Sequence, residues 1–143
     1  MSEFAPADTG FAERTRASFA KQGMMTTAQA AITAMEPGSV TITFPYSAQF
    51  TQQHGYLHAG FVTAMVDSAC GYAAYTLMPA GAEVLTVEYK VNLMSPAQGE
   101  GFEAIGRVVR AGKTITVCEG DVFAVREGGR KHIARMLATL MRI

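Results

Sequence analysis

Apolar residues recur along the chain with spacings that predict two helices and six strands. Residues 9–22 have the spacing of a short amphipathic helix, with Asp8 or Thr9 as its N-cap and Gly23 just past its end. The runs AQAAITAM and SVTITFPY follow, separated by the segment EPGS. Because Pro-Gly between two such runs marks a turn, these runs predict a β-hairpin.

A long apolar helix is predicted next, from His58 or Ala59 to about Leu77, before Pro79. Four strand candidates come after it, in the runs EVLTVEYKVNLM, GFEAIGRVVR, KTITVCEGDVFAVR and KHIARMLATLM. Short connections between the later strands predict an antiparallel meander. We therefore expect one α+β domain, residues 1–143, in which the long helix lies against a curved antiparallel sheet.

The first strand after the long helix has the clearest alternation. Its odd-numbered residues 85–93 are apolar and its even-numbered residues 86–92 are polar, which is typical of a half-buried strand. On this pattern Thr86 lies on the polar face, together with Glu88 and Lys90.

The predicted long helix has two different stripes. One stripe combines Asp67 with small residues, namely Gly60, Thr63, Ala64, Gly71 and Ala74. The other stripe is apolar and suits contact with a sheet, and consists of Val62, Met65, Val66, Ala69, Ala73 and Leu77. The small stripe leaves room for a second helix or a ligand to approach Asp67.

The charge distribution strengthens the interest in this helix. Charged residues make up 17% of the chain, against roughly 25% in typical globular domains. Within residues 37–82, Asp67 is the one formally charged side chain. At the centre of a membrane helix this carboxylate would cost roughly 2.5 kcal/mol or more. We therefore interpret the segment as a helix buried in protein and predict no membrane association.

Net charge and cysteine content bear on partners and location. The 12 Lys+Arg balance the 12 Asp+Glu, so no basic surface favours nucleic acid as a partner. Cys70 and Cys118 are too few for a disulfide framework. The first residues, MSEFAPADTG, lack the basic and apolar regions of a signal peptide. These features together predict a cytoplasmic protein.

The start of the long helix and Asp67 are both candidates for chemistry. Backbone N–H groups at His58-Ala59-Gly60 and the positive end of the helix dipole suit an oxyanion. Asp67 lies about 12 Å beyond Ala59 along the helix axis, which is too far for Asp67 and the helix start to act on the same carbonyl group. Two such helices packed antiparallel across a two-fold axis would place Asp67 of one chain beside the helix start of the other. We therefore predict two composite sites in a homodimer.

Three strings of residues resemble a known family. HGYLHAGFVTAMVDSACGYAA, VEYKVNLMSPAQGEG and VVRAGKT are similar to hotdog-fold acyl-CoA thioesterases of the phenylacetyl-CoA thioesterase type, in the 4-hydroxybenzoyl-CoA thioesterase superfamily. The likeness covers roughly residues 40–142. In that family a His-Gly-Gly motif opens the helix and the catalytic Asp stands nine positions after the His, as Asp67 does after His58. The resemblance implies the hotdog fold, homodimers or homotetramers, and no cofactor apart from the coenzyme A of the substrate.

The resemblance also implies roles for individual residues. Asp67 would be the nucleophile or the general base that activates water, and the Ala59 N–H would stabilise the oxyanion. Ala59 replaces the first Gly of the motif, but the oxyanion needs only its N–H. His58 would orient the site or assist the departing thiolate. Gln52 stands where the family often has an Asn that contacts the carbonyl or water, and Thr86 matches a position that helps to hold the water.

Coenzyme A and the acyl group would contact further residues. The resemblance implies that Gly60 lies on the coenzyme A side and that Arg110 and Lys113 contact its phosphates. Phe61, Met65 and Tyr72 are candidates to line an aromatic or medium aliphatic acyl pocket.

Two other chemistries have less support. His54 and His58 have a helical metal-ligand spacing, but Gly55 between them favours a loop, so we expect no metal. Cys70 lies near Asp67 on the helix but has no His base in register, so we interpret it as a small buried hydrophobe.

The leading hypothesis is therefore hydrolysis of an aromatic or medium-chain acyl-CoA thioester. A module that binds acyl-CoA without hydrolysing it is the alternative from a different class. A hotdog hydratase or dehydratase of acyl thioesters has less support, because those enzymes arrange a His and an acidic residue differently.

Overall fold

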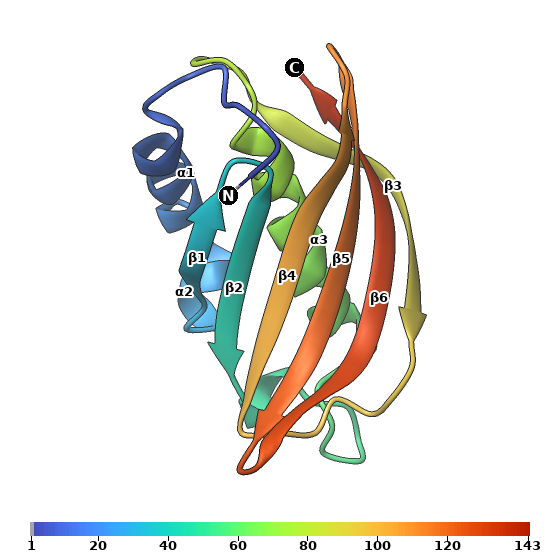
Figure 1. Cartoon of the computed structure of the whole chain (residues 1–143). Coiled ribbons are helices and arrows are strands. Elements are labelled where there is room, and N and C mark those ends of the chain that lie inside the picture. The colour runs from blue at the N-terminus through green and yellow to red at the C-terminus, as the bar shows by residue number, and fades with distance from the viewer. Residues whose placement is uncertain (1) are drawn as a thin grey trace.

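A curved six-stranded antiparallel sheet wraps one long helix (Figure 1) in the computed structural model, which describes residues 2–143. The strand order is β1-β2-β4-β5-β6-β3. The strands are β1 (Ala31–Glu36), β2 (Ser39–Pro45), β3 (Val84–Leu93), β4 (Gly101–Ala111), β5 (Ile115–Arg126) and β6 (Gly129–Arg142). The helices are α1 (Phe11–Ala20), α2 (Gly23–Thr27), the 3-10 turn η1 (Ala48–Phe50) and α3 (Ala59–Tyr75). This arrangement confirms the predicted α+β hotdog fold.

The long helix α3 begins as the sequence predicts. His58 is its N-cap in an extended conformation, and its Nδ1 accepts a hydrogen bond from the Gly60 N–H at 2.8 Å. The helix ends at Tyr75, slightly before the expected Leu77. Its apolar stripe is buried against the sheet, whereas the stripe around Asp67 stays partly exposed. Among residues 2–143, no helix combines the length and apolar character needed to cross a membrane.

Two glycines let α3 lie directly on the middle of the sheet. A Cβ at Gly106 of β4 would stand 2.3 Å from the backbone carbonyl of Ala69, and one at Gly120 of β5 would stand 2.5 Å from Val66 Cγ2. At these two positions no side chain larger than hydrogen fits between strand and helix. The strands can therefore curve closely around α3.

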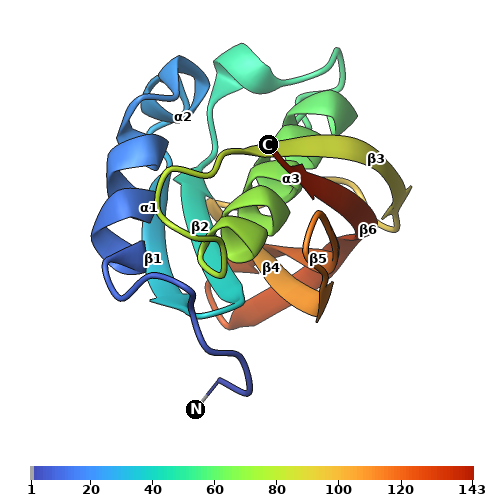
Figure 2. The same cartoon turned by 90° about the horizontal axis from the view of Figure 1, so that it is seen from above.

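The N-terminal helix differs from its predicted range of residues 9–22. It is divided into α1 and α2, because Gln22 is extended (φ −77°, ψ 107°) and Gly23 begins a second helix instead of ending the first. The N-cap is Gly10. Asp8 does not occupy the cap position, and its carboxylate accepts bonds from the Gly10 N–H at 2.9 Å and from Arg14 Nε at 3.0 Å. Figure 2 shows both helices on the β1 side of the sheet.

The predicted hairpin is confirmed, but the predicted meander holds only for the last three strands. Glu36 pairs with Ser39 across the turn, where Gly38 has a positive φ of 80°. Strands β4, β5 and β6 pair in sequence order. Strand β3 pairs with β6 instead of β4, because β2 already occupies the other side of β4.

The side-chain alternation in β3 is interrupted by a bulge. Thr86 pairs with the buried Leu140, but the register then shifts, and Glu88 pairs with Thr139 on the opposite face. The prediction that Thr86 shares a face with Glu88 and Lys90 is therefore wrong. Val87 is the extra residue, and its insertion turns Thr86 toward α3.

Strand β3 is also far more exposed than a half-buried strand. Leu85 is 53% exposed, Val87 54%, Tyr89 46% and Leu93 50%. Because β3 is an edge strand, large apolar side chains and unpaired backbone groups lie together on one side of the molecule.

Candidate functional site

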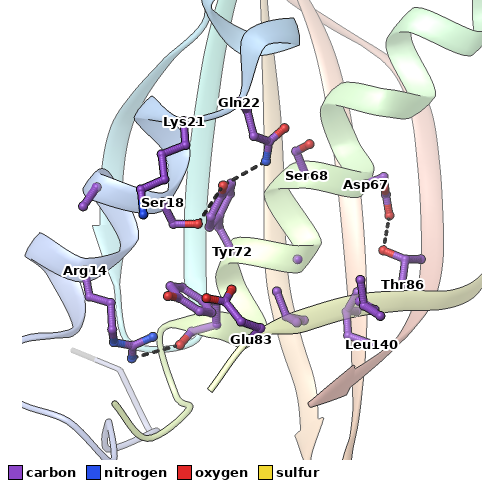
Figure 3. Close-up of a pocket in the computed structure, with 15 residues that line it drawn as sticks. Arg14, Ser18, Lys21, Gln22, Asp67, Ser68, Tyr72, Glu83, Thr86 and Leu140 are labelled. Carbon is purple, nitrogen blue, oxygen red and sulfur yellow. Dashed lines mark hydrogen bonds between the residues drawn. The ribbon is translucent and has the colours of Figure 1, made fainter. Parts of the chain in front are cut away.

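Asp67 and Thr86 form a hydrogen-bonded pair at the surface between α3 and β3. Thr86 Oγ1 donates to Asp67 Oδ1 at 2.7 Å (Figure 3). Partial burial raises the pKa of Asp67 above its ordinary value, and the Thr86 hydrogen bond opposes this shift. A carboxylate with a raised pKa is a stronger base than an exposed one, and its second oxygen remains available.

A cavity of about 710 Å³ opens beside this carboxylate. Its walls come from α1, the middle of α3 and the start of β3, and Leu140 contributes from β6. Asp67 and Thr86 lie at one end of the cavity, and Tyr72 lies farther along α3 (Figure 3). Of the three predicted acyl-pocket residues, Tyr72 lines this cavity, while Phe61 stacks on Phe50 and Met65 is fully buried.

The start of α3 offers one specific backbone donor. The Gly60 N–H donates to His58 Nδ1, and the Phe61 and Val62 N–H groups donate to the His58 carbonyl oxygen. Within residues 2–143, the Ala59 N–H has no hydrogen-bond partner. The first turn therefore presents the Ala59 N–H, at the positive end of the helix dipole, to an external acceptor.

The same hydrogen bond determines the tautomer of His58. Because Nδ1 accepts from Gly60, the neutral ring carries its proton on Nε2. His58 can thus donate through Nε2. His54 lies in the preceding loop and does not share a helix with His58, which argues against a helical metal site.

Ala59 and Gln52 line a second cavity of about 360 Å³, at the other end of β3, next to Leu93 and Met94. The Gln52 side-chain oxygen accepts from the His54 N–H at 2.5 Å. Its amide NH₂ group is therefore the part of the side chain that can contact a carbonyl or water.

The structure thus brings the expected residues into two groups. Asp67 and Thr86 line one cavity, and the residues near the helix start, namely Gln52, His58, Ala59 and Gly60, lie at or beside the other. Within one chain these two groups lie at opposite ends of β3.

Arg110 and Lys113 join neither group. Both are exposed at the tip of the β4–β5 hairpin. Ala111, beside Arg110, is separated from Thr86 by three strand spacings, about 14 Å. Neither residue lines the two cavities.

Sequence reasoning missed the contribution of α1 to the Asp67 cavity. Ser18 and Gln22 line it and approach the Tyr72 hydroxyl. Ser18 lies in α1 and Gln22 just after it, and no local signal in the sequence relates them to a helix that begins near residue 59.

Comparison with known proteins places this geometry in a family. A family model described as "Thioesterase superfamily" matches residues 54–129, more than half of the chain. A thioesterase family protein from Silicibacter pomeroyi has a solved structure that is 49% identical, with a TM-score of 0.92, and the match covers 94% of this chain and 98% of that one. The PaaI protein of the Escherichia coli phenylacetic acid degradation operon shares the fold, with a TM-score of 0.84 at 19% identity over 96% of each chain.

A protein of Saccharolobus solfataricus, provisionally named an esterase, is 35% identical over 85 residues. This match covers 59% of the present chain and 60% of that relative, so it spans less than two thirds of the relative's length. The match of the family model over the central helix and strands β3, β4 and β5, together with the 49% identical solved structure, shows that this chain belongs to the thioesterase superfamily.

Proposed function

We propose that this protein is an acyl-CoA thioester hydrolase acting on aromatic or medium-chain acyl groups, with each active site formed by two chains. The observation that carries the proposal is the Thr86–Asp67 pair in the wall of a large cavity of a thioesterase-family fold. A carboxylate with a raised pKa beside a cavity is suited to act as the base or nucleophile in hydrolysis of a thioester.

In the proposed reaction, ionised Asp67 either takes a proton from the attacking water or attacks the thioester carbonyl itself. The carbonyl oxygen becomes an oxyanion, which accepts a hydrogen bond from the Ala59 N–H of the other chain. The C–S bond then breaks. The thiolate leaves and receives a proton, in the water route the one that Asp67 took from water, while the His58 Nε2–H donates a hydrogen bond to the sulfur. In the direct-attack route, water then hydrolyses the anhydride formed between Asp67 and the acyl group and supplies this proton. In both routes the products are a carboxylic acid and the coenzyme A thiol.

The exposed edge of β3 supports a specific dimer. The Asp67 cavity adjoins Leu85 and Thr86 at the start of β3, and the Ala59 cavity adjoins Leu93 at its end. Antiparallel pairing of two β3 edges about a two-fold axis would therefore place the Asp67 cavity of each chain beside the Ala59 cavity of the other, which gives two sites per dimer. Pairing centred on Tyr89 would also place Glu88 opposite the partner's Lys90.

Thiol release from a panel of acyl-CoA thioesters tests the proposal. We expect Asp67→Asn to lower kcat about 10²- to 10⁴-fold, the range for loss of a catalytic acid or base. Glu83→Gln is the matched control, because Glu83 lines the same cavity but does not bond Thr86. It should leave the rate unchanged.

Three outcomes would count against the proposal. An unchanged rate in Asp67→Asn would remove Asp67 from catalysis. Tight acyl-CoA binding by the wild type without thiol release would favour a binding module. A wild type that neither binds nor hydrolyses acyl-CoA would exclude both functions.

A further inference from the structure

Gln52 lies on a tight turn in the connection between β2 and α3. This connection spans residues 46–58, and Figure 1 shows it at the lower end of the sheet. Two backbone hydrogen bonds close the turn, from the Gln52 N–H to the Tyr56 carbonyl oxygen at 2.9 Å and from the Gly55 N–H to the Gln52 carbonyl oxygen at 3.0 Å. We call residues 52–56 the Gln52 turn.

A single side chain from outside holds the tip of the Gln52 turn. Tyr46 Oη donates to the Gly55 carbonyl oxygen at 3.0 Å. Among residues 2–143, this is the one hydrogen bond that joins residues 53–55 to a residue outside the turn. The Tyr46 N–H donates to the Glu100 carbonyl oxygen at 3.1 Å, which ties the Tyr46 backbone to the start of β4. A residue fixed to the sheet therefore holds the turn.

The direction of the Gln52 side chain depends on the shape of this turn. Gln52 Oε1 accepts from the His54 N–H at 2.5 Å, so the backbone of the turn determines where the amide NH₂ group lies. Gly55 has a positive φ of 83°, which glycine adopts without strain. Gln52 lines the cavity that also contains Ala59. Movement of the turn would therefore displace the Gln52 amide relative to the Ala59 N–H.

The hydrogen bond from Tyr46 lies at the surface, which separates its effect on geometry from its effect on stability. Tyr46 is 41% exposed, and Gly55 is exposed as well. Without the hydroxyl, water can bind the Gly55 carbonyl oxygen, so no buried polar group is left unpaired. Loss of the hydroxyl should thus loosen the turn and leave the free energy of unfolding almost unchanged.

We propose that Tyr46 is a positioning residue, which holds the Gln52 turn so that the Gln52 amide NH₂ group meets the thioester carbonyl or the attacking water. Gln52 contacts the reacting atoms, and Tyr46 acts only through Gln52. The inference rests on the proposed function, because it concerns the Ala59 half of each composite site. Tyr46 precedes the residues 54–129 that the family model matches.

A double-mutant cycle in the thiol-release assay tests the inference. Tyr46→Phe should lower kcat about threefold to tenfold, the range for one neutral hydrogen bond, and change KM by less than about twofold. Gln52→Ala removes the group that Tyr46 positions, so it should lower kcat more than Tyr46→Phe does. In the Gln52→Ala background, Tyr46→Phe should cause no further loss.

Three results of this cycle would overturn the inference. Equal losses of kcat from Tyr46→Phe in both backgrounds would show that Tyr46 acts independently of Gln52. A Tyr46→Phe variant with the wild-type rate would show that the hydroxyl has no part in catalysis. A variant that is partly unfolded in the assay, with normal activity per folded molecule, would show a role in stability alone.

The turn offers a second variant with a matched control. Gly55→Ala leaves Tyr46 and Gln52 in place and strains the backbone at φ 83°, while the added methyl would have no neighbour within 4 Å. It should lower kcat, as Tyr46→Phe does. Gly81→Ala is the control, because Gly81 has a φ of 86° and equally open surroundings in the connection between α3 and β3. It should leave kcat unchanged, and equal losses in the two variants would count against the Gln52 turn.

Hydrogen exchange measured by NMR separates this inference from the proposed function. In Tyr46→Phe the His54 and Gly55 amides should exchange faster than in the wild type, while the amides of α3 keep their rates. Unchanged exchange at the turn in an active thioesterase would overturn the inference alone. If no thioester is hydrolysed, the proposed function fails and the catalytic part of the inference fails with it, whereas faster exchange would still establish that Tyr46 holds the turn.

Discussion

The two edges of the sheet differ in what they expose. Strand β1 exposes only small or polar side chains, namely Ala31, Thr33, Ala34 and Glu36, and its register shifts after Ile32. Strand β3 exposes Leu85, Val87, Tyr89 and Leu93 along ten residues. A short, irregular, polar edge discourages further strand pairing, while a long apolar edge favours it. The contrast supports the proposed dimer, in which the sheet would end at β1 and continue into a second chain at β3.

Placing a charge on the β3 edge should have the largest effect. At a two-fold axis near Tyr89, each Asp in a Tyr89→Asp dimer would meet its own copy, and the apolar contact would be lost. We expect a monomer with at least about 10²-fold lower thioesterase activity, because each site would lack the oxyanion donor of the other chain. Light scattering after gel filtration, together with thiol release, measures both properties.

Thr33→Asp places the same charge on the β1 edge, where the residue is already exposed. It should leave both the oligomeric state and the rate unchanged. A Tyr89→Asp monomer with full activity would contradict the composite site, and an unaltered active dimer would contradict the choice of edge.

The middle of the sheet should tolerate much less change than either edge. In Gly106→Ala the added methyl would overlap the backbone of α3 at Ala69, so the helix would have to move. We expect a loss of about 3 kcal/mol in the free energy of unfolding, measured with urea. Gly101→Ala on the same strand is the control, since its nearest neighbour would be 3.9 Å away. Equal losses in both variants would show that the close approach at Gly106 is not what limits stability.

The sequence was sufficient to predict features that depend on local patterns. The hairpin, the start of α3 and its buried stripe follow from turn residues, capping and helical periodicity, and all are confirmed. The face of Thr86 was not predictable, because a bulge leaves no mark in an alternating sequence such as LTVEYK. The position of β3 beside β6 depends on which edge β2 occupies, which is a property of the whole sheet.

The candidate site shows the same limit. His58, Ala59 and Asp67 could be named as candidates from the sequence because they lie at the start of or on one helix with a recognisable spacing. Ser18 and Gln22 were not, because their part in the cavity depends on how α1 packs against α3, a contact between segments far apart in the chain.

Substitutions on the two faces of the sheet should have a smaller effect than those above. They compare the face that points to α3, where Thr86 lies, with the opposite face. Thr86→Val removes the hydrogen bond that lowers the pKa of Asp67, so this pKa should rise further. In the proposed reaction activity needs ionised Asp67, so it should be lost as pH falls through that pKa. The acid limb of kcat/KM should therefore move to higher pH, with less than about a tenfold loss on the plateau.

Thr139→Val is the matched control for that profile. Thr139 bonds Glu88 on the other face of the sheet, so its loss should leave the acid limb in place. An acid limb that stays in place in Thr86→Val, or shifts to lower pH, would show that this hydrogen bond does not set the ionisation of Asp67.

The smallest effect is expected in the free energy of unfolding when Asp67, which lies next to β3, is replaced. Burial raises the pKa of Asp67, so the native state binds more protons than the unfolded state, and stability falls as pH rises through this pKa. Asp67→Asn removes the buried charge. After allowance for solvent screening, it should stabilise the fold at pH 7 by less than about 1 kcal/mol, and by less still at pH 4. Urea unfolding at the two pH values would contradict this if the variant were less stable at both.

The extra residue at Val87 bears on how this strand can vary in length. It places Thr86 and Glu88, two positions apart, on opposite faces, where Thr86 bonds Asp67 and Glu88 bonds Thr139. Deletion of Val87 would make Thr86 and Glu88 neighbours, and neighbours point to opposite faces of a regular strand, so both side chains could keep their present partners. A relative that is one residue shorter here can therefore keep both contacts, and an alignment with it should place the gap at Val87 so that Thr86 meets its true equivalent.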